Sequence, residues 1–202
     1  EDFGPDVDAE QWEENLTSLL AEFVADRRRG GVPYSRGDMA WTQLGRILRY
    51  QVAVPTRPFE VEGSGTPGGR RRRRREMLIP APLPLVPRYP TVERSLNDLS
   101  PFFGAEPYRA IALTELLPSY LHFLARLGLI HPEQMDAALD ELRRLSEQTV
   151  ELVRYRADPR AVEAVKAAWS SKTLKALKED SALAEARQLD VQRLPRSERP
   201  RA

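Results

Sequence analysis

The feature that most limits the fold is the stretch of residues 105–129, which is apolar around most of a helix circumference. Such a helix must be surrounded by other elements, because any face left in water would expose apolar surface. Pro118 lies near its middle and predicts a kink or a break, because proline lacks a backbone N–H and clashes with the preceding turn. We therefore expect this segment at the centre of the core, with Leu116, Leu121 and Leu124 buried.

Apolar residues recur at helical spacing on both sides of that stretch, which predicts an all-α protein. Cap residues, glycines and prolines mark where the helices begin and end. The starts that we expect are Asp8, Ser35, Thr91, Ala105, Pro132 and Pro159, with a last helical segment around Leu177. Connections in the C-terminal half are short, so the sequence predicts a multi-helix antiparallel array of about six to seven helices.

Residues 56–90 interrupt this pattern with an irregular insertion that is rich in proline, glycine and arginine. Alternating apolar residues around the Gly63–Gly69 turn are consistent with a short β-hairpin between helix two and helix three, and a disordered insertion is the alternative. The prolines from Pro80 to Pro90 predict an extended path that no helix can occupy. Apolar residues interleave with these prolines, so we expect the strap to lie on the protein's own surface rather than in a partner's groove.

These patterns divide the chain into four parts. An N-terminal helical pair is expected at residues 1–55, the insertion at 56–90, a C-terminal helical unit at 91–190 and a tail at 191–202. The tail should be disordered, because it has little apolar surface to bury. We expect one compact domain overall, since the chain has 202 residues and domains cluster near about 100–150.

Composition argues against several classes of site. The absence of cysteine excludes disulfides, thiolate nucleophiles and cysteine-bound metals, and it fits a cytoplasmic protein. No apolar run approaches the roughly 18 residues that span a bilayer, so we expect no membrane segment. The two histidines are His122 and His131, and no third ligand accompanies Glu115 and His122, so we expect no metal site. Phosphate-loop, dinucleotide and serine-elbow motifs are missing, so we predict no catalytic residue and no cofactor.

The most unusual surface feature is a run of consecutive arginines beside a glycine-rich hinge. Its members are Arg70, Arg71, Arg72, Arg73, Arg74 and Arg75. Guanidinium groups bind phosphate. If the whole run contacted duplex DNA, the logarithm of the binding constant would fall with the logarithm of the salt concentration with a slope of roughly −5. The alternative is a solvated surface loop, or one that is neutralised by the seven acids in the first fourteen residues. The net charge of the whole chain is only +1, which is not typical of a polycation that binds nucleic acid.

Three interpretations of function follow. The first is a non-enzymatic helical module that binds another protein or a second copy of itself, because the catalytic inventory is thin and amphipathic helices are abundant. The alternative is a nucleic-acid-associated protein that uses Arg70–Arg75 for phosphate contacts. A continuous basic face from that run to Arg27–Arg29 or Arg46–Arg49 would support it. The third is an enzyme built from scattered carboxylates and arginines, which a deep apolar pocket with converging polar groups would support.

Deleting Gly63–Arg75 should leave the fold intact, because this stretch offers no apolar side chain to a core. We expect the free energy of unfolding, measured by urea denaturation, to change by no more than about 0.5 kcal/mol, as for ordinary surface changes. A loss above about 2 kcal/mol would show instead that the arginines are structural.

Overall fold

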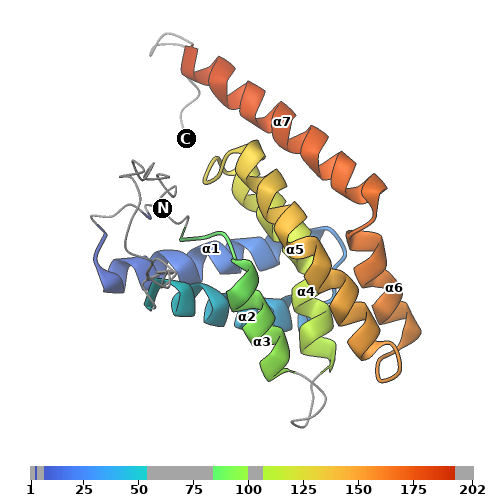
Figure 1. Cartoon of the computed structure of the whole chain (residues 1–202). Helices are drawn as coiled ribbons and strands as arrows, with labels where there is room; N and C mark the ends of the chain where they lie inside the picture. Colours follow the sequence, from blue (N-terminus) through green and yellow to red (C-terminus); the bar gives the residue numbers. More distant parts are fainter. Residues whose placement is uncertain (1–2, 4–6, 54–83, 100–106, 194–202) are drawn as a thin grey trace, which may run out of the picture.

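The computed structural model describes residues 3, 7–53, 84–99 and 107–193, with the side chains of 187–193 excepted (Figure 1). Over these ranges the chain forms seven α-helices and no strand, so the predicted all-α fold is confirmed. The helices are α1 (Ala9–Arg29), α2 (Tyr34–Ala53), α3 (Tyr89–Asp98), α4 (Pro107–Arg126), α5 (Pro132–Val153), α6 (Pro159–Ala168) and α7 (Ser171–Arg193). The hairpin considered for the insertion and the run Arg70–Arg75 lie outside the described residues.

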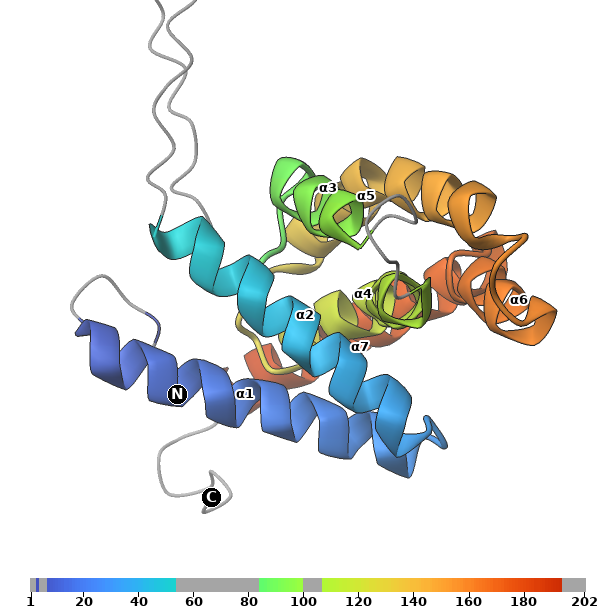
Figure 2. The same ribbon diagram turned by 90° about the horizontal axis from the view of Figure 1, so that it is seen from below.

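Helix α4 lies at the centre of the array. It packs against α2, α5, α6 and α7, and Figure 2 shows it between the α1–α2 pair and α5. Fourteen of its twenty residues are buried, so neighbouring elements cover it on almost every side. Leu121 and Leu124 are fully buried and Leu116 nearly so, which confirms the predicted core. Each such leucine stabilises the fold by about 1.5–3 kcal/mol relative to an exposed one.

Of the kink or break predicted at Pro118, the break is wrong, because α4 continues through this residue as a single helix. Pro118 has no backbone N–H, so the Thr114 carbonyl one turn earlier lacks its helical donor. The indole Nε1 of Trp169, at the C-terminal end of α6, donates to that carbonyl oxygen at 2.8 Å. Trp169 is itself buried and so shields this bond from water. A side chain from a distant part of the chain therefore replaces the missing donor.

The predicted ends of α1 are confirmed. The Asp8 carboxylate accepts a hydrogen bond from the backbone N–H of Gln11 (2.8 Å), which satisfies one of the free donors of the first turn. Gly30 follows the last residue of the helix, and Gly31 has a φ of 89°, a conformation that glycine adopts without a steric penalty.

The predicted starts of α5 and α6 are also confirmed, and each has a local cap. The backbone N–H of His131 donates to the side-chain oxygen of Gln134 at 2.8 Å. The Asp158 carboxylate accepts from the backbone N–H of Arg160 at 2.8 Å. His131 therefore has the capping role that its position before a proline suggested.

Two predicted boundaries are wrong. Ser35 lies inside α2 rather than before it, because the backbone N–H groups of Arg36 and Gly37 both bond to the Pro33 carbonyl at 3.1 Å. Pro90 does not continue the extended path but occupies the first turn of α3. A proline is tolerated there, since the N–H that it lacks has no partner within the helix.

The described part of the proline strap, residues 84–88, packs on the protein itself as expected. Gln51 holds it from α2: its Nε2 donates to the Val86 carbonyl at 3.0 Å, and its Oε1 accepts from the backbone N–H of Arg88 at 2.8 Å. The Tyr120 hydroxyl on α4 donates to the Leu85 carbonyl at 3.1 Å. Leu85 itself is buried, so the strap closes one side of the core.

The last helix, α7, extends beyond the other helices at its C-terminal end (Figure 1). Its first half is attached to the body, where the Ser181 hydroxyl contacts the Met135 sulfur at 3.4 Å and Lys178 Nζ lies 3.3 Å from the Asp136 carboxylate. The helix reaches Arg193, so residues 191–193 of the predicted tail are helical, and 194–202 lie outside the described residues.

Replacing Trp169 with phenylalanine should destabilise the fold by about 1–3 kcal/mol, because it leaves the buried Thr114 carbonyl without a partner. Urea unfolding followed by circular dichroism measures the change. Trp41→Phe is the matched control, since Trp41 is only half-buried and its indole has no partner among the described residues. Equal losses in both variants would contradict the role assigned to the Trp169 N–H.

Candidate binding sites

His122 joins α4 to α7. Its Nε2 lies 2.8 Å from the Asp180 carboxylate, and the ring is almost completely buried. Burial lowers the pKa of His122; the Asp180 hydrogen bond and charge oppose this shift, while the charges of Arg126 and Arg27 add to it. At neutral pH the ring is therefore uncharged and donates to Asp180. This is the hydrogen-bonded core histidine that the sequence predicts.

Glu115 joins α4 to α2 instead of meeting His122. Its two carboxylate oxygens accept from Arg36 Nη1 at 3.2 and 2.9 Å. Burial raises the pKa of Glu115, and the Arg36 charge only partly offsets it. Glu115 and His122 thus have separate partners, and the described residues contain no group of three or more ligands that could hold a metal ion.

The arginines at the end of α1 are partly neutralised. Asp26 accepts a hydrogen bond from Arg126 at 2.9 Å and forms a second ion pair with Arg27. Burial alone would raise the pKa of Asp26, but the hydrogen bonds and charges of these two arginines outweigh it and lower the pKa. On α2, Arg49 pairs with Glu13 of α1. The segments Arg27–Arg29 and Arg46–Arg49 therefore do not present every guanidinium to a ligand.

A groove of about 210 Å³ runs between α1 and α2. Each helix contributes a stripe at helical spacing, and the lining residues are Ala21, Val24, Ala25 and Arg28 of α1 with Tyr34, Asp38 and Trp41 of α2. Tyr34 is 63% exposed, and the Arg28 guanidinium lies 5.1 Å from its ring centroid. Neither Arg28 nor Asp38 has an ion-pair partner among the described residues. The groove therefore combines an apolar floor with an exposed aromatic ring and two free charges.

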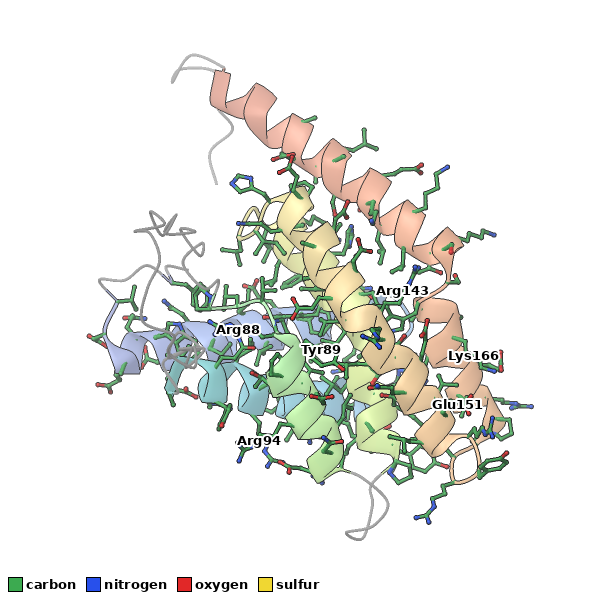
Figure 3. All side chains as sticks on the ribbon, viewed as in Figure 1. Arg88, Tyr89, Arg94, Arg143, Glu151 and Lys166 are labelled. Carbon is green, nitrogen blue, oxygen red and sulfur yellow. The ribbon has the colours of Figure 1, made fainter. Side chains whose placement is uncertain are left out.

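A smaller pocket of about 100 Å³ lies between α2 and α3. It is lined by Arg46, Ile47 and Tyr50 of α2 and by Thr91, Arg94, Ser95 and Asp98 of α3. Arg94 Nη1 donates to the Tyr50 hydroxyl at 2.6 Å, and the guanidinium lies 4.9 Å from the centroid of the same ring. In Figure 3, Arg94 lies on the side of α3 that is nearer to α2.

Gln43 precedes Ile47 by one turn of α2. It is fully buried, and neither its Nε2 nor its Oε1 has a hydrogen-bond partner among the described residues. An unsatisfied buried amide costs about 1–3 kcal/mol, so it calls for a structural or functional reason. No sequence pattern distinguishes Gln43 from a surface glutamine.

The third hollow, of about 320 Å³, lies between α5 and α6. Figure 3 labels three of its lining residues, Arg143 and Glu151 of α5 and Lys166 of α6. Its floor is apolar, with Val150, Val165 and Trp169, and its rim carries charges of both signs. Two of these charges are already paired within the fold, because Lys166 binds Glu163 and Glu151 binds Arg154, both at 2.7 Å. The balanced rim favours neither an anion nor a cation.

The described linings of the three hollows contain carboxylates and basic groups but no histidine, and no serine or threonine is paired there with a base. The enzyme interpretation stays an alternative. The sequence alone does not predict the α1–α2 groove or the α2–α3 pocket, although the lining residues on each helix follow helical spacing. Which helices face each other is a tertiary property.

No known protein family, curated protein or solved structure matches the chain. Among the described helices, none combines the length and the apolar character needed to cross a membrane.

Stability should respond to His122 below neutral pH. Because the pKa of His122 is lowered in the folded state, the unfolded chain binds a proton that the folded state resists as the pH falls through about 6.5. The stability due to the neutral ring is thus present above this pH and lost below it. We expect the wild-type advantage over His122→Gln, from urea unfolding, to shrink as pH falls from about 7.5 to about 5.5.

Glu115 acts in the opposite direction, since its raised pKa favours the folded state on acidification. It is present in both proteins, so its contribution cancels in the comparison. A difference that stays constant or grows on acidification would contradict the pKa direction given for His122.

Proposed function

We propose that the protein is a non-enzymatic helical module that binds another protein through the α1–α2 groove. The observation that carries this proposal is the exposed Tyr34, which stands with Arg28 and Trp41 over an apolar floor. Tyrosine, tryptophan and arginine are the residue types that contribute most to protein–protein affinity. An aromatic ring that stays largely in water in the free protein gains apolar burial when a partner covers it.

The groove suits an amphipathic helix of the partner. The stripes on α1 and α2 each cover two helical turns. On α1, the small side chains of Ala21 and Ala25 leave room for a third helix to approach. Arg28 and Asp38 lie on opposite walls without ion-pair partners in the described part of the chain. We therefore expect the partner helix to bring an acidic residue to Arg28 and a basic residue to Asp38, on either side of an apolar anchor.

The test places a photo-crosslinking amino acid at position 34 of the full chain in its native host. The matched control carries it at position 155, because Tyr155 is 82% exposed but lies beyond the end of α5, outside this groove. The crosslinked segment is identified, made as a peptide and titrated against the purified protein. Tyr34→Ala should weaken binding by about thirtyfold, the value of a hot-spot residue, while Tyr155→Ala leaves it unchanged.

Equal crosslinking at positions 34 and 155, or an affinity unchanged by Tyr34→Ala, would contradict the proposal. Crosslinks between two copies of this chain would replace the partner helix with self-association. Equilibrium sedimentation of the wild-type protein and Tyr34→Ala then checks that outcome.

Nucleic acid is the second candidate, because the six consecutive guanidinium groups of Arg70–Arg75 can contact phosphates. The segment that carries Arg70–Arg75 leaves the described part of the chain after Ala53 and returns at Pro84. These two ends lie close together, since Gln51 Nε2 contacts the Pro84 carbonyl at 3.4 Å. Removing the run should then lower the salt slope of DNA binding, by about 0.9 for each phosphate that the arginines neutralise.

A further inference from the structure

We propose that the pocket between α2 and α3 binds a phosphate group, with Arg46 and Arg94 as its charged ligands. Two guanidinium groups and three hydroxyls line one small hollow there. The hydroxyls are those of Tyr50, Thr91 and Ser95. This proposal is independent of the α1–α2 groove, because the two sites share no residue.

Helical spacing brings these groups together. Arg46 and Tyr50 are one turn apart on α2, and Thr91, Arg94 and Ser95 occupy one face of α3. Both helices therefore direct hydrogen-bond donors toward the same space. The donors are suited to phosphate, because a planar guanidinium bonds to two oxygens at once and each hydroxyl can donate to one more.

The Arg94 guanidinium is held ready for a ligand. Its Nη1 donates to the Tyr50 hydroxyl, and its Cζ lies 4.9 Å from the centroid of the Tyr50 ring. A guanidinium has five N–H donors, so this contact leaves most of them available. Fixing the side chain before binding reduces the entropy lost when the ligand arrives.

Neither arginine of the pocket has a carboxylate partner among the described residues. Other arginines of α2 do, since Arg36 pairs with Glu115 and Arg49 with Glu13. The Asp98 carboxylate lines the pocket one turn after Arg94 without pairing with it. An arginine that precedes an acid by four residues is the less favourable order for a helical ion pair. The pocket therefore keeps a net positive charge.

The hollow is the smallest of the three described, at about 100 Å³, and its polar groups lie around one small space that a phosphate group can enter. Ile47 forms an apolar part of the lining.

The experiment titrates the full chain with inorganic phosphate and with pyrophosphate, following the arginine side-chain N–H signals by NMR. Arg94→Gln and Arg46→Gln should each weaken binding by about tenfold, the value of a charge-assisted hydrogen bond. Asp98→Asn should strengthen binding by about threefold to fivefold, because it removes a negative charge that repels the phosphate. Arg144→Gln, an exposed arginine on α5, is the matched control and should change nothing.

A thermal melt of each variant shows that it is folded. If phosphate does not bind, if Arg144→Gln weakens binding as much as Arg94→Gln, or if Asp98→Asn has no effect, the proposal is overturned.

A single-stranded oligonucleotide provides the second arm and identifies the source of the phosphate. If Arg94→Gln weakens binding of both inorganic phosphate and the oligonucleotide, the pocket binds a nucleic-acid phosphodiester. If it weakens only phosphate and pyrophosphate, the natural ligand is a small phosphorylated molecule. Both results support a phosphate site. The crosslinking test at position 34 is unaffected by either, so failure of one proposal is distinguishable from failure of the other.

Discussion

The hydrogen bond from the Trp169 indole to the Thr114 carbonyl allows the central helix to exist as one piece. α4 is buried on most sides, so an unpaired carbonyl within it would cost about 1–3 kcal/mol. Pro118 creates such a carbonyl, and the end of α6 supplies the donor. The same contact fixes α6 against α4 and so sets the floor of the α5–α6 hollow. The buried residues Ala161, Val162 and Val165 of α6 hold the same helix in place together with this bond.

The distribution of charge partners separates the structural arginines from those free to bind. Ion pairs with buried or half-buried acids use Arg36 and Arg126 to join helices, and these pairs leave little for a ligand. Arg28, Arg46 and Arg94 have no carboxylate partner within the described ranges. Arg28 lines the α1–α2 groove together with Tyr34, and the other two line the α2–α3 pocket together with Tyr50. The two proposed sites therefore follow from the charges that folding does not neutralise.

Local chemistry made much of the fold predictable. Asp8 and Asp158 cap helices because their carboxylates reach the first free N–H groups of the following turn, an interaction within a few residues. The burial of Leu121 and Leu124 follows from an apolar circumference. The two wrong helix boundaries share one cause. Ser35 and Pro90 were placed by residue type alone, whereas the neighbouring backbone bonds decide which turn a residue joins.

The sequence by itself determined the helical class, the central helix and most helix starts, because periodicity and capping act over a few residues. Only the tertiary structure decided that α4 continues through Pro118, since the replacement donor, Trp169, lies fifty-five residues away from Thr114. It likewise decided that Arg46 of α2 and Arg94 of α3 share one pocket. Helical spacing groups residues on one face, but which two faces meet depends on how every helix buries its apolar side against α4.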